Sequence, residues 1–351
     1  MLFQVYPTTM RLAACVLVLA GGCGGPDGAA APPAARVSET RRLMGVPWTI
    51  TVFAATPEAG GEAVEAAFAE VGRLEGILSD YDPGSEVSQL SAAAPTARPV
   101  PLGDDLWRVL SAAVEWRDRS GGAFDPTVGP LTTLWRQARR SGVIPRADKL
   151  AAARQAVGIS RLSLHAEQRA VSLRMPEMRL DLGGIGMGYA VDRGLEVLAR
   201  RGVTSAMIDA SGDIAVSGPP PGASAWRIEV AALADREGRA ERRVVDLVNG
   251  AVTTSGDAFQ AVEIEGVRYS HVVDPRTGLG VPGPAAVTVI ATDCTTADAV
   301  ATAASVLGPE DGLPFVERVP GAAARFVVGA ADGHREICSS RWPSQVAQPR
   351  R

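Results

Sequence analysis

Residues 181–192, DLGGIGMGYAVD, hold four glycines within six positions. Glycine costs about 0.5–1 kcal/mol relative to alanine inside a helix or strand, so such a cluster indicates a tight turn or a close backbone approach. The apolar run before the glycines predicts a strand, and apolar residues with helical spacing follow them up to Gly202. We therefore expect a strand, a glycine loop and a helix whose N-terminus presents free N–H groups to an anion such as phosphate. An ordinary strand-to-helix turn is the alternative, because the spacing matches neither the dinucleotide fingerprint nor the phosphate loop.

Outward from this loop, helical and strand-like patterns are mixed and no internal repeat is present. Apolar periodicity predicts helices over 57–81, 102–120 and 296–308 besides the helix after the glycines. Short strand-like runs occupy most of the remaining chain: 48–54, 206–210, 214–218, 226–233, 242–248, 251–256, 259–266, 267–275, 285–292, 323–330 and 334–340. This order predicts an α+β fold, a single two-lobed domain with a mixed, largely antiparallel sheet and packed helices.

The composition is that of an ordinary globular protein. The chain has 351 residues, of which 46% are hydrophobic and 21% charged, and a net charge of −4. Such a length suffices for one large domain or two modest ones. The small net charge gives no indication of a nucleic-acid partner.

The first residues have the features of an export signal. The stretch MRLAACVLVLAGGC, from Met10 to Cys23, combines one positive charge, a short apolar run and small residues that end in a cysteine. It predicts a signal peptide with a lipoprotein-type cysteine over residues 1–23, with translation starting at Met1 or Met10. Ala20 stands where lipoprotein signals usually have leucine, so simple secretion is the alternative. We expect an exported protein on the periplasmic side of a bacterial membrane, anchored by lipid at Cys23.

Composition also sets the expected domain limits. Residues 24–42 are rich in Gly, Pro and Ala, which predicts a flexible linker, followed by a folded domain over 43–340 and a tail over 341–351. Export leaves Cys294 and Cys338 in the mature domain, as one disulfide or as two buried small residues. Three histidines and the absence of any CxxC pair argue against a zinc site.

Three further segments combine turn-forming and polar residues. They are SGGAFDPTVGPL (120–131), TTSGDAFQ (253–260) and YSHVVDPRTGLG (269–280). Each alone is typical of a turn. Together with the glycine loop they supply backbone donors, an arginine and several carboxylates, which a site for a diphosphate and a divalent cation requires.

As a set, these motifs resemble the FAD:protein FMN transferases, the ApbE-type flavin transferases of bacterial cell envelopes. Five motifs follow in the family's order between Met44 and Gly329: GGAFDPTVGPL, DLGGIGMGYAVD, TTSGD, YSHVVDPRTG and VTVIATDCTTADAVAT. The resemblance implies an enzyme that splits FAD with magnesium and attaches the FMN half, through its phosphate, to a threonine or serine hydroxyl of an acceptor protein, releasing AMP. It also implies export, often as a lipoprotein.

The resemblance further implies site residues. Asp298 and Thr302 match the family's metal-binding Asp-x-x-x-Thr, whose spacing places both on one helix face, and the carbonyl of Gly186 would complete the protein's share of magnesium ligands. Contacts to the flavin nucleotide or its phosphates are expected from residues of all the other motifs: Met44, Tyr81, Ala123, Phe124, Asp125, Asp181, Gly184, Thr254, Ser255, Gly256 and Arg276.

The acceptor hydroxyl must lose its proton as its bond to phosphorus forms. His271 is the expected base because imidazole titrates near neutral pH, and Asp257 is the alternative. Two other functions stay open: an FAD pyrophosphatase that gives FMN and AMP, and a non-enzymatic flavin-binding lipoprotein. Within the family, an aromatic residue at the position of Tyr81 goes with transfer, and the Asp298–Thr302 pair favours an enzyme. The expected acceptor is a membrane-associated redox protein.

Overall fold

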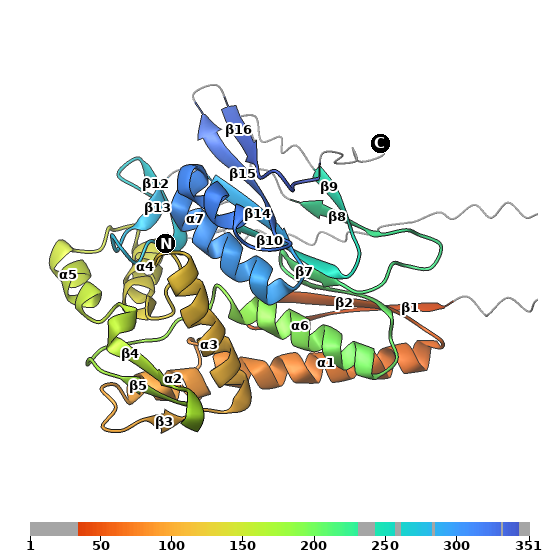
Figure 1. Ribbon diagram of the computed structural model, residues 1–351, viewed down its shortest axis with the longest axis horizontal. Coiled ribbons are helices and arrows are strands. Elements are labelled where there is room, and N and C mark those ends of the chain that lie inside the picture. The colour runs from red at the N-terminus through yellow and green to blue at the C-terminus, as the bar shows by residue number, and fades with distance from the viewer. Residues whose placement is uncertain (1–33, 231–242, 257–260, 283–284, 331–332, 344–351) are drawn as a thin grey trace, which may run out of the picture. The chain divides into compact units, whose positions relative to one another are not determined.

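An eight-stranded sheet forms the centre of the protein (Figure 1). The computed structural model describes residues 34–230, 243–256, 261–282, 285–330 and 333–343. From one edge to the other, the strands are β1 (Ala35–Leu43), β2 (Val46–Ala54), β6 (Ser205–Ala210), β7 (Asp213–Val216), β10 (Gly250–Gly256), β14 (Ala285–Ala291), β15 (Ala323–Ala330) and β16 (Gly333–Cys338). Every strand pair in these described ranges is antiparallel, which confirms the predicted α+β class with a largely antiparallel sheet.

Three helices lie side by side along one face of the large sheet. They are α1 (Pro57–Leu78), α6 (Gly186–Arg200) and α7 (Cys294–Glu317), which contact β2, β6 and β10 respectively. Alternate residues of β2, such as Ile50 and Val52, are fully buried against them. The resulting layer of helices on a sheet holds the largest hydrophobic core of the protein.

The opposite face of the sheet is partly covered by a hairpin of two strands. These are β8 (Trp226–Val230) and β9 (Arg243–Leu247). Trp226 packs on Phe53 of β2 with ring centroids 5.9 Å apart, and both belong to a second apolar cluster. The hairpin thereby covers part of this face, where Phe53, Met207, Ile214 and Ile290 are partly buried against the cluster.

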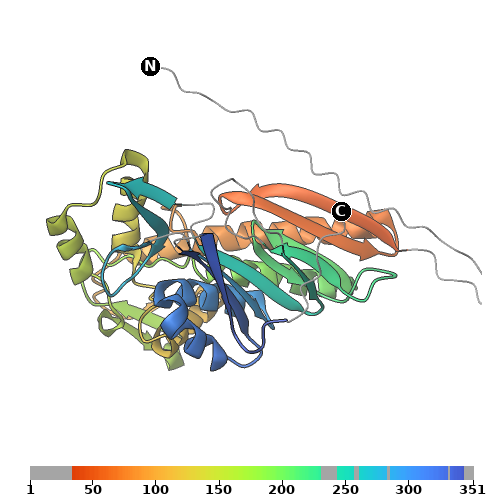
Figure 2. The same cartoon turned by 90° about the horizontal axis from the view of Figure 1, so that it is seen from above.

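The remaining elements form a smaller group at one end of the molecule (Figures 1 and 2). Its helices are α2 (Glu86–Ala92), α3 (Asp104–Arg119), α4 (Gly129–Ser141) and α5 (Ala147–Gln155), with 3₁₀ turns at Ile159–Arg161 and Ala166–Gln168. Its strands form two three-stranded sheets, β3 (Val100–Pro101) with β5 (Ala170–Leu173) and β4 (Leu162–His165), and β11 (Ala261–Ile264) with β12 (Val267–Val273) and β13 (Gly280–Pro282). Helix α4 contacts β12, which joins the sheet of β11, β12 and β13 to the helices of this group.

The predicted helices are confirmed. The helix expected over 57–81 begins at Pro57 as predicted and ends at Leu78, and Thr56 caps its N-terminus by accepting a hydrogen bond from the N–H of Ala59. The helix expected over 296–308 ends its first part at Gly308, whose φ of 70° breaks the helix before the chain continues in α7.

Two predictions from local composition are wrong. Residues 35–42, expected in the linker, form most of β1, because every second side chain of this stretch is partly buried, and Val37 lies against Gly60 of α1. The strand expected just before the glycine loop does not form. Residues 178–182 belong to no strand, and the N–H of Asp181 donates to the carbonyl of Pro126 instead.

The predicted end of the domain at residue 340 also needs correction. Trp342 is buried, and the guanidinium of Arg341 donates to the carbonyls of Val316 and Ala322. The domain therefore extends at least to Trp342. The predicted signal peptide lies outside the described residues.

The two cysteines of the domain are both free thiols. Cys294 is buried at the start of α7, whereas Cys338 is exposed at the end of β16, so neither predicted alternative holds for Cys338. Within the described ranges, no helix combines the length and the apolar character that crossing a bilayer requires.

Candidate functional site

A cavity of about 740 Å³ opens between the large sheet with its helices and the smaller group of elements. Its wall is formed by the turn between β1 and β2, the end of α1, the start of α6, and parts of α4, α7 and β12. Many predicted site residues line it: Met44, Tyr81, Ala123, Phe124, Asp125, Asp181, Gly184, Gly186, His271 and Thr302. Segments far apart in the sequence thus meet around one space.

The motif around Asp125 is a compact turn that braces the glycine loop. The carboxylate of Asp125 accepts hydrogen bonds from the N–H of Thr127 at 2.8 Å and from its hydroxyl at 2.6 Å. Burial raises the pKa of Asp125, and these two bonds oppose that rise. The carbonyl of the next residue, Pro126, accepts the N–H of Asp181, so the turn holds the start of the glycine loop in place.

The glycines of the loop allow it to pack directly on α7. A Cβ atom at Gly184 would lie 2.8 Å from the hydroxyl oxygen of Thr302. One at Gly188 would lie 2.3 Å from the carbonyl oxygen of Cys294 and 2.9 Å from Cβ of Asp298. The glycines are therefore required by close approach to α7, which places both predicted metal ligands of α7 beside the loop.

Asp298 is a buried carboxylate at this contact. It is 5% exposed, and its Oδ2 accepts the N–H of Gly188 at 3.2 Å. Burial raises the pKa of Asp298 well above its usual range, and the charges of Asp213 and Asp192 raise it further. Burial also raises the pKa of Asp213 to about 7.

The surroundings of Asp298 suit a divalent cation. No arginine, lysine or histidine among the described residues forms an ion pair with it, although buried carboxylates are normally paired or bound to metal. The hydroxyl of Thr302 lies on the same helix face one turn later, and Gly186 begins α6 beside them. Within the described part of the chain, no three His, Cys, Asp or Glu side chains form a metal cluster. One carboxylate, a hydroxyl and a backbone carbonyl fit magnesium, which keeps several waters and binds substrate phosphates.

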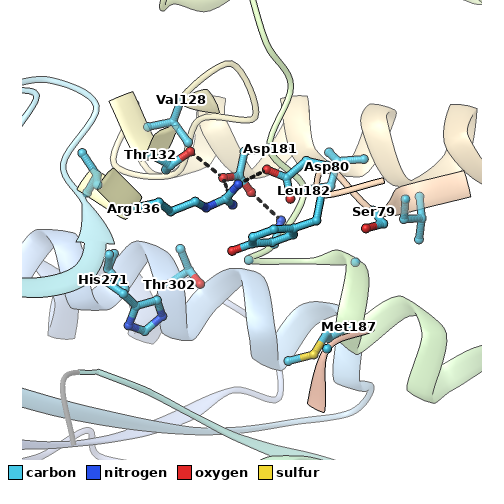
Figure 3. Close-up of a pocket in the computed structure, with 18 of the residues that line it drawn as sticks. Ser79, Asp80, Val128, Thr132, Arg136, Asp181, Leu182, Met187, His271 and Thr302 are labelled. Carbon is cyan, nitrogen blue, oxygen red and sulfur yellow. Dashed lines mark hydrogen bonds and ion pairs between the residues drawn. The ribbon is translucent and has the colours of Figure 1, made fainter. Parts of the chain in front are cut away.

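Asp181 is the centre of a charged network in the cavity wall (Figure 3). Its Oδ2 accepts the hydroxyl of Thr132 at 2.7 Å and Nη2 of Arg136 at 2.9 Å, while its Oδ1 accepts the N–H of Gly183. Arg136 also donates through Nη1 to Asp80. Burial and the charge of Asp181 raise the pKa of Asp80, and Arg136 opposes this rise. Both oxygens of Asp181 are thus engaged with protein groups.

Helix α4 contributes to this wall without having been predicted from the sequence. Residues with helical spacing along α4 and its start line the cavity: Val128, Thr132, Trp135, Arg136 and Arg139. The signal was present in the sequence, because Pro130 stands in the first turn and Gly142 follows the last residue, as is typical of helix ends.

The turn between β1 and β2 forms the wall near the end of α1. Met44 has a φ of 48°, and its N–H donates to Oε1 of Glu75 at 2.8 Å. Gly45, the second residue of the turn, has a φ of 80°, so both residues adopt the left-handed conformation that such hairpin turns require. Glu75 therefore holds Met44 at the cavity.

His271 and Thr302 lie across the cavity from the network of Asp181 and Arg136 in Figure 3. His271 is provided by β12 and Thr302 by α7. The side chain of Met187, at the start of α6, borders the same space. These groups thus border the space that a substrate would enter.

Four predicted nucleotide contacts do not line this cavity. Thr253 of β10 faces Cys294 of α7, so Thr254 points to the other face of the sheet, where its hydroxyl bonds to that of Thr288 at 3.0 Å. Ser255 and Gly256 follow at the end of the same strand. Arg276 is held by Asp274 through two side-chain hydrogen bonds of 3.0 and 3.1 Å. The alternative base, Asp257, lies outside the described residues.

The sequence is similar to known proteins over most of its length. The sequence model of the ApbE family matches residues 44–326. The FAD:protein FMN transferase of Klebsiella pneumoniae is 29% identical over 337 residues, which cover 94% of this chain and 95% of that protein. The FAD:protein FMN transferase of Treponema pallidum is 31% identical over 330 residues, covering 89% of each chain.

The fold is similar to solved structures as well. The flavin transferase ApbE from Vibrio cholerae superimposes with a TM-score of 0.79 at 29% identity, covering 88% of this chain and 98% of that chain. The match of the family model extends from the turn at Met44 through the glycine loop to Phe326 in β15, and so includes the cavity and both predicted metal ligands of α7. The chain therefore belongs to the ApbE family.

Proposed function

We propose that this protein transfers FMN from FAD to a threonine or serine hydroxyl of an acceptor protein, through a phosphoester bond and with magnesium, and releases AMP. The observation that carries the proposal is the cavity lined by the glycine loop and Thr302, with the unpaired buried carboxylate of Asp298 one helical turn from Thr302 in α7. Relatives that carry the name FAD:protein FMN transferase cover almost the whole chain. Backbone N–H donors and metal ligands are the groups that can stabilise the negative charge that develops when a diphosphate is split.

Asp298, Thr302 and the carbonyl of Gly186 would hold the magnesium ion. When bound, the ion supplies positive charge that stabilises the negative charge developing on the phosphate oxygens of FAD. The N-terminus of α6, which begins at Gly186, adds backbone N–H groups and the positive end of the helix dipole.

The remaining groups would orient the substrate and move one proton. The oxygen of the acceptor hydroxyl forms a bond to the FMN phosphorus as the bond from this phosphorus to the AMP oxygen breaks. His271, which lines the cavity, accepts the hydroxyl proton, and AMP departs with the bonding electron pair. Asp257 stays the alternative base.

The direct test is incubation of the purified domain with FAD, magnesium and a candidate acceptor peptide, analysed by intact mass. A mass gain equal to one FMN on the peptide, with AMP in solution, supports transfer. Free FMN and AMP without any modified peptide would support the pyrophosphatase instead. Bound but unchanged FAD would support a flavin-binding lipoprotein.

Tyr81 offers a test that separates transfer from hydrolysis. Its ring lines the cavity at the exposed rim, where it can stack on the flavin and limit the access of water. We expect Tyr81→Asn to raise the ratio of free FMN to protein-bound FMN by about tenfold, because one aromatic contact contributes up to ~1.5 kcal/mol. Both products are quantified in one reaction. The control Tyr81→Phe keeps the ring and should keep the ratio; an unchanged ratio in Tyr81→Asn would mean that the ring only packs.

The location of the protein forms a separate part of the proposal. We propose that Cys23 carries the lipid anchor and that the acceptor is a membrane-associated redox protein. A cysteine with more than one acyl chain holds a protein stably at a membrane surface. Cys23→Ser should therefore move the protein from the membrane fraction to the soluble periplasmic fraction, with unchanged activity on a soluble acceptor peptide. If the wild-type protein is already in the soluble fraction, with a mature N-terminus other than Cys23, the protein is secreted without a lipid anchor.

A further inference from the structure

Arg136 is a heavily engaged cation of the cavity wall. Its guanidinium is 18% exposed and donates to two carboxylates, Asp80 through Nη1 and Asp181 through Nη2 at 2.9 Å. Its Cζ atom also lies 4.1 Å from the centroid of the Tyr81 ring. Arg136 thus joins α4, the segment after α1 and the glycine loop.

These contacts argue against Arg136 as a phosphate ligand. The group of Arg136, Asp80 and Asp181 contains one positive and two negative charges, so it presents no net positive charge to a phosphate. Binding a phosphate through this guanidinium would also leave two partly buried carboxylates without their partner, at a large cost.

Tyr81, by contrast, has the guanidinium of Arg136 against its ring. The tyrosine is 71% exposed, the highest value among the large hydrophobic side chains that the described ranges leave exposed. An aromatic ring with so few contacts rotates freely unless a neighbour restricts it. The guanidinium supplies that restriction, because its planar cation is attracted to the ring face and its own position is locked by two carboxylates.

We propose that Arg136 is a positioning residue that holds the Tyr81 ring at the cavity and thereby sets how FMN is divided between the acceptor hydroxyl and water. The inference rests on the proposed function, since it concerns the same reaction. Asp80 and Asp181 act through Arg136: they fix the guanidinium, and the guanidinium fixes the ring. The electrostatic attraction of an arginine to a partly exposed ring corresponds to an effect of about twofold to fivefold.

A double-mutant cycle tests this role. Arg136→Gln is made in the wild-type chain and in Tyr81→Ala, and the ratio of free to protein-bound FMN is measured for all four proteins. In the wild-type background the ratio should rise about twofold to fivefold. In the Tyr81→Ala background Arg136→Gln should not change it, because the ring on which it acts is gone. An equal rise in both backgrounds, or no rise in the wild-type background, would overturn the proposal.

Further variants guard against a loss of folding. Arg136→Lys keeps a positive charge beside Asp80 and Asp181 but lacks the planar group, so it should melt close to the wild-type temperature and give an intermediate ratio. Arg140→Gln, at an exposed arginine one turn further along the same helix that does not line the cavity, is the matched control and should behave as wild type.

The affinity for FAD is also measured for the same four proteins, by quenching of flavin fluorescence. If the wild-type protein modifies no acceptor, the proposed function fails, but the fluorescence cycle still tests the stack. Equal effects of Arg136→Gln on FAD affinity with and without the Tyr81 ring would then overturn it.

Discussion

Asp298→Asn should lower the rate of FMN transfer by about a hundredfold or more while the protein stays folded. Asparagine keeps an oxygen that can accept the N–H of Gly188, so the contact between α6 and α7 is preserved. It removes the negative charge that magnesium requires. The metal-free variant should be at least as stable as the wild type, because the charged form of Asp298 is disfavoured by burial and by Asp213.

Two measurements check this expectation. Magnesium should raise the melting temperature of the wild-type protein but not that of Asp298→Asn, since only the former binds the ion. Asp209→Asn is a matched control, because Asp209 of β6 accepts the N–H of Gly212, does not line the cavity and exerts no charge effect on Asp298; it should keep both the magnesium shift and most of the activity. Full activity of Asp298→Asn at low magnesium concentration would show that the metal site lies elsewhere.

Gly188→Ala should destabilise the protein by about 2–4 kcal/mol. The added methyl group would lie 2.3 Å from the carbonyl oxygen of Cys294 and 2.7 Å from its carbon, so α6 and α7 must move apart. The higher helix propensity of alanine, about 1 kcal/mol, offsets only part of this cost. Urea unfolding measures the difference in the free energy of unfolding.

A second helical glycine provides the control. A Cβ atom at Gly61 of α1 meets nothing within 4 Å, so Gly61→Ala should stabilise the protein by up to about 1 kcal/mol. If Gly188→Ala were as stable as the wild type, the close contact between the two helices would not be the reason for glycine at this position.

Much of the fold could be predicted from local patterns. The apolar residues of α1 recur at helical spacing, and the strands β6, β7, β10, β14 and β15 are short apolar runs between turn residues. The strand β1 was missed because its polar residues and the Gly- and Pro-rich stretch before it resemble a linker. Its pairing with β2 and the contact of Val37 with α1 are long-range interactions that composition does not reveal.

Some residues of the candidate site could be predicted from sequence motifs and others could not. The glycine loop, Thr302 and His271 belong to motifs with a recognisable order, and all of them line the cavity. Arg136 belongs to no such motif. It became visible only when α4 was placed beside the glycine loop and Tyr81.

The sequence by itself therefore determined the family, the class of fold and the residue types that can handle a diphosphate with a metal ion. Only the tertiary structure decided which of these residues face one space. Both Thr254 and Thr302 were predicted to place a hydroxyl in the site. The alternation of side chains along β10 turns Thr254 to the sheet face away from α7. Thr302 of α7 lines the cavity. The tertiary structure also decided the burial of Asp298. Its carboxylate is buried and has no cationic partner because Gly188 of α6 packs against it. The physical reason is that burial and facing depend on contacts between residues more than a hundred positions apart, which no local pattern encodes.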